Sequence, residues 1–172
     1  MIVLPPQQLR QIVDAAEAAY PDECCGLLVG RDVPGGIEVT RVHASANLGR
    51  RADRFEIDPR LWVDLSRALG KGPQKVVGLY HSHPDGPAQP SAHDLEAAWG
   101  EELVWIIVAV VGAGEAGKGG ADGGPAQAVQ VTAHILDHGG RQFRALDLRT
   151  GDWHPYPVRE MPESPKRGED AS

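Results

Sequence analysis

Two histidines and an aspartate stand close together in the sequence, at a spacing that suits a bound zinc ion. His81 and His83 lie two positions apart at the end of residues 75–80, whose apolar composition is typical of a buried strand. Because side chains at positions i and i+2 of a strand point to the same face, both imidazoles can reach one metal ion. Asp94 offers a third ligand. Two histidines and a carboxylate, with water in the fourth position, are typical of a hydrolytic zinc site.

The segment that carries Asp94 also has an ordinary structural interpretation. Ser91 followed three residues later by Asp94 resembles the capping box of a helix N-terminus, with an acidic residue where it opposes the helix dipole. A helix that begins at Ser91 would itself hold Asp94 near the strand end, so the two interpretations are compatible. The spacing alone leaves a metal site and a plain helix cap equally open.

The elements that must position these residues follow from hydrophobic periodicity and turn signals. The pattern predicts helices over residues 7–20 and 58–69 and from residue 91, and strands over residues 25–29, 37–46, 75–80, 103–111, 128–136 and 142–148. We expect the last two strands to form a hairpin that turns at residues 137–140. Buried and alternating strands with helices between them predict an α/β or α+β sandwich, with a central mixed sheet flanked by helices.

The domain organisation is expected to be simple. Residues 1–154 read as one domain, in which residues 112–126 form a flexible glycine-rich loop, and residues 155–172 read as a flexible tail rich in proline and charge. The glycines of the loop formally match nucleotide-binding motifs. However, the residues that follow them cannot easily begin the helix that such motifs need, so we interpret this stretch as a loop.

The composition argues against several classes of partner. A formal net charge of −7 disfavours nucleic acid and anionic membranes as the main partner. The longest apolar run, residues 103–111, is far shorter than the roughly 20 residues of a transmembrane helix, and the N-terminus lacks a signal-peptide pattern. Cys24 and Cys25 are adjacent and give no disulfide framework, which suits a reducing compartment. We therefore expect a cytoplasmic protein.

The remaining histidines give weaker signals. His134 and His138 are four residues apart, but they fall on a predicted strand, where that separation corresponds to roughly 13 Å. We therefore exclude this pair as a metal site. His43 and His154 belong to no motif and are interpreted as surface or hydrogen-bonded interior groups.

A further acidic residue, far upstream, completes the pattern. Glu23 stands at the mouth of the first predicted strand, within a Pro-x-Glu-x-x-Gly-x-Leu-x-Gly segment, and alone it would be interpreted as a solvated loop acid. Together with His81, His83, Ser91 and Asp94 it resembles the full signature of the JAMM (MPN-plus) zinc metalloprotease family.

The resemblance extends beyond the five polar positions. Asn47 followed by residues 55–59, Phe-Glu-Ile-Asp-Pro, resembles a segment that this family carries between its first strands and its second helix. The similarity covers roughly residues 4–148. It implies the JAMM/MPN architecture, which is similar to that of cytidine deaminases.

The resemblance also implies a role for each polar residue. His81, His83 and Asp94 would bind one zinc ion per chain, which would lower the pKa of a bound water to about 7. Glu23 would act as general base and then general acid, and Ser91 would donate its hydroxyl to the oxyanion. These roles describe a zinc metallopeptidase.

The expected substrate is also an implication of the resemblance. JAMM enzymes hydrolyse the amide or isopeptide bond after the C-terminal Gly-Gly of ubiquitin and related proteins. Compact bacterial members, which this chain resembles in length and in residues 81–85, are associated with ubiquitin-like sulfur-carrier proteins. The sequence leaves open the identity of the carrier, the pathway and the oligomeric state, a homodimer included.

Two alternatives belong to other functional classes. A non-catalytic scaffold of the same fold would be favoured if any of the proposed ligands or Glu23 were replaced, and all are present. A zinc nucleoside deaminase would need a His-x-Glu motif and a Pro-Cys-x-x-Cys pair, which the adjacent cysteines cannot supply. Cys25 shares strand parity with Glu23 and is a candidate neighbour of the site, whereas Cys24 faces away. Since three ligands suffice, neither cysteine is assigned to zinc.

Overall fold

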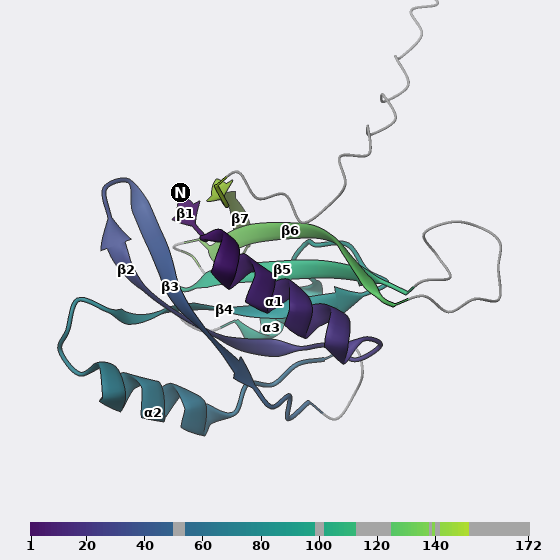
Figure 1. Cartoon of the computed structure of the whole chain (residues 1–172), viewed down its shortest axis with the longest axis horizontal. Coiled ribbons are helices and arrows are strands. Elements are labelled where there is room, and N and C mark those ends of the chain that lie inside the picture. The colour runs from purple at the N-terminus through teal and green to yellow at the C-terminus, as the bar shows by residue number, and fades with distance from the viewer. Residues whose placement is uncertain (50–53, 99–101, 113–124, 138, 140–141, 152–172) are drawn as a thin grey trace, which may run out of the picture.

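A mixed β-sheet forms the centre of the molecule, and helices pack against it (Figure 1). The structure is a computed structural model that describes residues 1–49, 54–98, 102–112, 125–137, 139 and 142–151. Within them, the strands are β1 (Ile2–Val3), β2 (Cys25–Val33), β3 (Gly36–Ser45), β4 (Lys75–Pro84), β5 (Val104–Val111), β6 (Gln127–Leu136), β7 (Phe143–Leu146) and β8 (Leu148–Arg149). The helices are α1 (Pro6–Ala19), α2 (Pro59–Leu69) and α3 (Ala92–Ala97). The predicted sandwich of a mixed sheet and flanking helices is confirmed.

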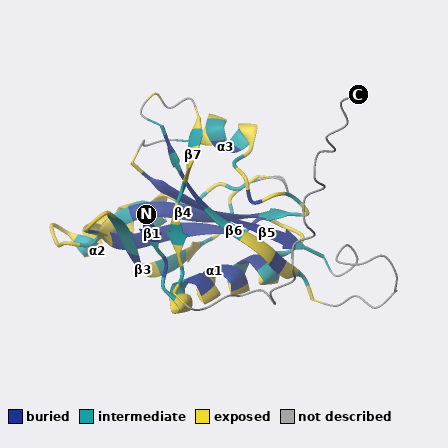
Figure 2. Ribbon diagram, turned by 90° about the horizontal axis from the view of Figure 1, so that it is seen from above, coloured by how far each residue is buried: buried dark blue, intermediate teal, exposed yellow. Residues whose placement is uncertain are grey.

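Each face of the sheet has its own apolar core because successive strand residues point to opposite faces. Along β2, Leu28 packs in the cluster that contains the apolar stripe of α1, whereas Leu27 and Val29 pack in the cluster that contains Leu65 of α2. Helices α1 and α3 lie on opposite sides of the sheet (Figure 2). The sheet is therefore covered on both faces, and its central strands are buried.

Strand order decides which parts of the chain meet. The strands lie side by side in the order β7-β6-β5-β4-β2-β3-β1-β8. Strand β2 is antiparallel to β4, so its start lies beside the end of β4, with Cys25 opposite His81. Strand β4 is parallel to β5, and parallel neighbours need a crossover connection. That crossover carries α3 and places it near the end of β4.

Glycine allows the central strands to approach closely. A Cβ atom at Gly78 of β4 would clash with the carbonyl oxygen of Val104 on β5. Every other residue has a Cβ, so only glycine fits there without moving one of the two strands.

The observed elements differ from the predicted ones at several ends. Strand β4 continues past residue 80 to Pro84, so both histidines lie within the paired strand. The predicted strand over 142–148 is two strands, β7 and β8, which pair with different neighbours on either side of Asp147. Strands β6 and β7 pair antiparallel, as the predicted hairpin requires. The short strand β1 was not predicted, because two residues carry no detectable periodicity.

Parts of the predicted organisation lie outside the described residues. These are most of the glycine-rich loop 112–126, residues 138 and 140 of the predicted turn, and the tail 155–172. In the part of the chain that the structure describes, no helix has the length and apolarity needed to cross a membrane.

Candidate active site

The two histidines of β4 and the aspartate of α3 converge on one point. The Nε2 atoms of His81 and His83 are 2.9 Å apart. Asp94 places Oδ1 3.1 Å from Nε2 of His81 and Oδ2 3.4 Å from Nε2 of His83. His81 is completely buried, and Asp94 is 3% exposed. The structure thus brings together the three residues that the sequence suggested as ligands.

The two imidazole rings are oriented in different ways. Nδ1 of His83 lies 2.8 Å from the carbonyl oxygen of Pro87, and a carbonyl can only accept, so Nδ1 carries a proton and Nε2 faces Asp94 and His81. The ring of His81 is stacked on Phe55, with centroids 4.2 Å apart, and meets the edge of Trp105. Among the described residues, Nδ1 of His81 has no hydrogen-bond partner. His83 is therefore oriented by a hydrogen bond and His81 by aromatic packing.

The capping box predicted at the start of α3 is present in full. Ser91 donates its backbone N–H and its hydroxyl to Oδ2 of Asp94, at 2.6 and 2.8 Å, and Oγ accepts from the Asp94 N–H at 3.0 Å. The same contacts hold the Asp94 carboxylate toward the histidines. The helix cap and the metal-ligand interpretation are compatible, as the sequence suggested.

Charge and burial prepare these groups to act as ligands. Burial alone would raise the pKa of Asp94, but its hydrogen bonds with His81 and His83 hold that pKa well below its usual range. Burial lowers the pKa of His81 in spite of Asp94. Burial acts to lower the pKa of His83 as well, but the hydrogen bonds with Asp94 and Pro87 and the nearby carboxylates together have the larger effect. The net result is that the pKa of His83 is raised. Asp94 is therefore an anion and His81 a neutral donor at neutral pH.

The donor set fits a zinc ion. A tetrahedral zinc ion with bonds of about 2.0–2.1 Å holds its ligand atoms about 3.3 Å apart, similar to the separations seen here. In the described residues, only His81, His83 and Asp94 form such a cluster. These residues therefore match a site with three protein ligands and one open position.

Glu23 lies beside this cluster, in a cavity of about 320 Å³. The cavity is lined by Pro21, Glu23, His83, Pro84, Asp85, Gly86 and Ser91. Glu23 is 8% exposed, and the amide of Asn47 donates to its backbone carbonyl at 2.9 Å. Because β2 and β4 are antiparallel, a glutamate just before β2 reaches the end of β4. The structure thus places a carboxylate, a histidine and a serine hydroxyl around one opening.

The neighbouring serine and cysteines have structural contacts. Ser82 points away from the histidines, and its hydroxyl accepts from the Cys24 N–H at 2.9 Å. Cys24 packs with the α1 side of the core, on the face away from the site. Cys25 is 1% exposed, and burial raises its pKa to about 12, so it is a protonated thiol and a poor metal ligand.

Several supporting residues were not found from the sequence. Trp105 packs edge-on to His81, and the Pro87 carbonyl orients His83. Tyr20 donates its hydroxyl to Oδ2 of Asp85 at 2.9 Å, which ties the segment before Glu23 to the loop after His83. The sequence carried no signal for these contacts, because each joins residues whose distance depends on strand pairing.

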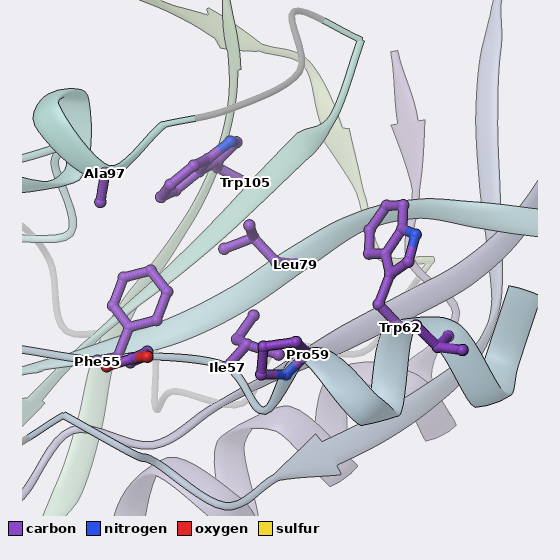
Figure 3. Close-up of a pocket in the computed structure, with 9 residues that line it drawn as sticks. Phe55, Ile57, Pro59, Trp62, Leu79, Ala97 and Trp105 are labelled. Carbon is purple, nitrogen blue, oxygen red and sulfur yellow. The ribbon is translucent and has the colours of Figure 1, made fainter.

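A second, apolar cavity lies next to the cluster (Figure 3). Its volume is about 480 Å³, and its lining includes Phe55, Ile57, Trp62, Leu79 and Trp105. Phe55 and Trp105 also contact the ring of His81. This cavity therefore shares a wall with the histidine cluster.

The other histidines are not part of the cluster. His134 is buried, and its Nε2 bonds the Thr132 hydroxyl at 2.9 Å. Among the described residues, His43 belongs to no cluster of three or more metal-binding side chains. His138 and His154 lie outside the described residues.

A mixed sheet with a His-x-His pair on a central strand and an aspartate on the following crossover helix is the arrangement expected of the JAMM/MPN class. Residues 5–119 match the family described as prokaryotic homologs of the JAB domain. The chain belongs to this family.

Two relatives have described activities in their names. The desampylase of Haloferax volcanii is 33% identical over 95 residues, which cover 55% of this chain and 67% of that protein. The CysO-cysteine peptidase of Mycobacterium tuberculosis is 27% identical over 109 residues, which cover 63% of this chain and 73% of that protein.

Solved structures share the fold. A solution structure of a Desulfitobacterium hafniense protein has a TM-score of 0.66 and 27% identity, over 91% of this chain and 99% of that one. The crystal structure of a JAB1/MPN domain protein from Archaeoglobus fulgidus has a TM-score of 0.51 and 19% identity, over 87% of this chain and 98% of that one. The second likeness supports the architecture alone, and it agrees with the predicted JAMM/MPN fold.

Proposed function

We propose that the protein is a zinc-dependent metallopeptidase that hydrolyses the amide bond after the C-terminal Gly-Gly of a ubiquitin-like sulfur-carrier protein. The observation that supports it most is the buried cluster of His81, His83 and Asp94 beside the cavity of Glu23. The names of the two relatives, a desampylase and a CysO-cysteine peptidase, are consistent with a peptidase of this kind.

In this proposal His81, His83 and Asp94 hold the zinc ion. Bound zinc supplies Lewis acidity, which polarises a carbonyl and activates water. The protein contributes two imidazoles and one carboxylate, and it keeps them in place through the capping box and the ring contacts described above. The three ligands leave one side of the cluster open toward the Glu23 cavity.

Glu23 moves the proton in this mechanism. Its carboxylate takes a proton from the attacking water and delivers it to the nitrogen of the leaving amine. The residue is mostly buried yet lines the cavity together with His83, so the carboxylate is both held and within the same opening.

Ser91 binds the carbonyl oxygen in this mechanism. Its hydroxyl lines the same cavity and now donates to Oδ2 of Asp94. Rotation about one side-chain torsion directs the O–H to a substrate carbonyl, where the developing negative charge makes the hydrogen bond stronger. The backbone N–H of Ser91 continues to bind Asp94 after that rotation.

The shape of the cavity agrees with a glycine-rich tail. Pro84, Gly86 and Pro21 line the opening beside the cluster. An extended Gly-Gly segment lacks side chains and can pass where bulkier residues cannot, and its peptide groups can bond to exposed backbone. We infer that selection for this tail rests on exclusion of larger side chains.

Product analysis tests the proposal. Ubiquitin-fold carriers with C-terminal amino-acid or peptide extensions are incubated with the zinc-loaded protein, and the product masses are measured. We expect cleavage after Gly-Gly that stops when a chelator removes the metal. Cleavage at another bond would disprove the substrate assignment, and purified protein that binds no zinc under zinc-replete conditions would favour the non-catalytic scaffold.

A further inference from the structure

One side chain outside the proposed catalytic group makes an unusually complete set of hydrogen bonds. The amide nitrogen of Asn47 donates to the carbonyl oxygens of Glu23 at 2.9 Å and Arg54 at 3.1 Å. Its amide oxygen accepts from the backbone N–H groups of Gly49 at 2.8 Å and Glu56 at 3.0 Å. All four hydrogen-bonding positions of the amide group are therefore used.

These bonds join two segments that flank the cluster. One is the segment before β2 that contains the proposed base, Glu23. The other is the segment around Phe55, which Asn47 bonds on both sides, at Arg54 and Glu56. An isolated bridge between Asn47 and Ile57 continues the contact.

The backbone is shaped for this contact. The Leu48 N–H donates to the Glu56 carbonyl at 2.9 Å, beside the bonds of the Asn47 amide. A Cβ atom at Gly49 would clash with the carbonyl oxygen of Arg54, so the close approach needs glycine at that position. Residues 47–49 and 54–56 are thus held together by both backbone and side-chain hydrogen bonds.

Phe55 transmits this arrangement to a proposed metal ligand. Its ring is stacked on His81 with an interplanar angle of 21° and a centroid distance of 4.2 Å. His81 has no hydrogen bond at Nδ1 among the described residues, so its ring direction depends on packing against Phe55 and Trp105. Most metal-binding histidines are oriented by a hydrogen bond at the nitrogen that does not bind the metal. In His81, aromatic packing orients the ring instead.

We propose that Asn47 is a positioning residue that couples the base Glu23 to the ligand His81 through the Phe55 segment. This inference rests on the proposed function. One amide fixes the backbone of the base and, by way of Phe55, the ring of the ligand, so their relative placement depends on it. A displacement of about 1 Å between such groups costs about 100-fold in rate.

A residue that lacks either the NH2 donor or the oxygen acceptor of the Asn47 amide cannot replace it. Aspartate has nearly the same shape and keeps the acceptor for Gly49 and Glu56, but it has no donor for Glu23 and Arg54. Its carboxylate would instead face two carbonyl oxygens, which repel it. Asn47→Asp is therefore a sharp test, because it changes hydrogen bonding and leaves volume almost unchanged.

The test compares Asn47→Asp and Phe55→Leu with a matched control, Gln8→Ala. Gln8 donates its side-chain N–H to the carbonyl oxygen of Thr40 at 2.9 Å, so the control loses a bond of the same kind, from a half-buried amide to the backbone. It belongs to α1, on the other side of the sheet. Zinc affinity is measured by competition with a chelator, unfolding by its thermal midpoint, and cleavage of a Gly-Gly-extended carrier by kcat and KM.

We expect both site variants to bind zinc about 10-fold more weakly and to lose about 10-fold to 100-fold in kcat, with KM changed less than about twofold. The double variant should lose little more than either single variant, because both act through the same contact. The control should keep the wild-type zinc affinity and kcat. The proposal is wrong if Asn47→Asp keeps both values, or if its losses match those of Gln8→Ala at an equal drop in thermal midpoint.

The measurements of zinc affinity and of carrier cleavage separate this inference from the proposed function. Zinc affinity does not depend on a substrate, so wild-type protein that binds zinc but cleaves no carrier would contradict the proposed substrate and leave the affinity comparison valid. If Asn47→Asp does not fold, Phe55→Leu decides, since it removes the ring contact without touching the amide bonds. Unchanged zinc affinity in a folded Phe55→Leu variant would overturn the coupling.

Discussion

At the scale of single residues, the proposed step from metal binding to hydrolysis depends on Glu23. His81, His83 and Asp94 could hold a metal in a protein that catalyses nothing. A buried carboxylate in the adjoining cavity gives that cluster a group that can accept and return a proton. The proposed chemistry therefore depends on a residue that takes no part in the ligand cluster.

Replacement of that carboxylate should separate zinc binding from turnover. Glu23→Gln keeps the size of the side chain but removes the base, so we expect turnover to fall by about 10²-fold to 10⁴-fold while zinc stoichiometry is unchanged. Glu38→Gln is the control for loss of one negative charge, since Glu38 is a half-buried residue that is paired with Arg31 away from the site. Retained activity in Glu23→Gln would remove the residue from its role as base.

Ser91 is the N-cap of α3, and its hydroxyl is proposed to bind the substrate carbonyl oxygen. These two roles can be measured separately. Glycine is tolerated at a helix N-cap at a cost of a few tenths of a kcal/mol, whereas alanine costs about 1 kcal/mol. Both changes remove the hydroxyl, so we expect both Ser91→Gly and Ser91→Ala to lose about 10²-fold to 10³-fold in kcat. Only Ser91→Ala should lower the free energy of unfolding clearly in urea titrations. A kcat loss that follows stability from one variant to the other would mean that Ser91 is a cap alone.

At the scale of elements, two strand pairings assemble the site. The antiparallel pair β2 and β4 brings the start of one strand to the end of the other, with Cys25 opposite His81. The parallel pair β4 and β5 forces a crossover, and the crossover carries Ser91 and Asp94. A shift of either register by one residue would turn the histidines to the other face of the sheet.

The loop between His83 and α3 is pinned to β6. The Thr132 hydroxyl donates to the carbonyl oxygen of Ala88 at 2.6 Å, and the Ala88 side chain is buried against Ile107 and Ala109. The residue before Ala88 is Pro87, whose carbonyl orients His83. The loop thus depends on a hydroxyl from a strand that contributes no ligand.

Thr132→Val should loosen that loop. The change keeps the shape of the side chain but leaves a buried carbonyl without its donor, so we expect a loss of about 1–3 kcal/mol in the free energy of unfolding. Zinc affinity should also fall, because His83 loses a firmly placed acceptor. Thr40→Val is a matched control, since Thr40 donates its hydroxyl to the Val29 carbonyl at 3.2 Å away from the loop. Equal zinc affinity in the two variants would show that the loop needs no such anchor.

At the scale of the whole molecule, the buried thiol should make the fold sensitive to alkali. Burial raises the pKa of Cys25 from 9.0 to about 12, so between these values the unfolded chain releases a proton that the folded protein keeps. The unfolded state then binds fewer protons, and stability falls as pH rises, by about 1.4 kcal/mol per pH unit for this one group. Burial raises the pKa of Tyr80 in the same direction.

Urea unfolding at a series of pH values from 8 to 11 measures this effect. Cys25→Ala removes the titrating thiol, so its stability should fall less steeply above pH 9 than that of the wild type. Below pH 9 the two slopes should agree, since the thiol is then protonated in both states. Parallel curves over the whole range would mean that Cys25 ionises without cost in the folded protein.

Local patterns in the sequence already contained much of the fold. The apolar stripe of α1, the Asp58-Pro59 start of α2 and the Ser91 cap of α3 depend on neighbours within a few residues, and each has the predicted form. The His-x-His parity on β4 follows from the strand period alone, as does the direction of Ser82 toward the opposite face of the sheet. The strand bounds were less accurate, because β1, β8 and the end of β4 are defined by pairing with distant partners.

The sequence by itself determined the identities and spacing of the chemical groups, and through them the resemblance to a family of zinc metalloproteases. Tertiary structure decided how those groups are held: Phe55 against His81, the Pro87 carbonyl on His83, and Asn47 between Glu23 and the Phe55 segment. Composition and periodicity record only which face a side chain takes. The distance between residues far apart in the chain depends on strand order and register, which are settled only when the whole sheet assembles.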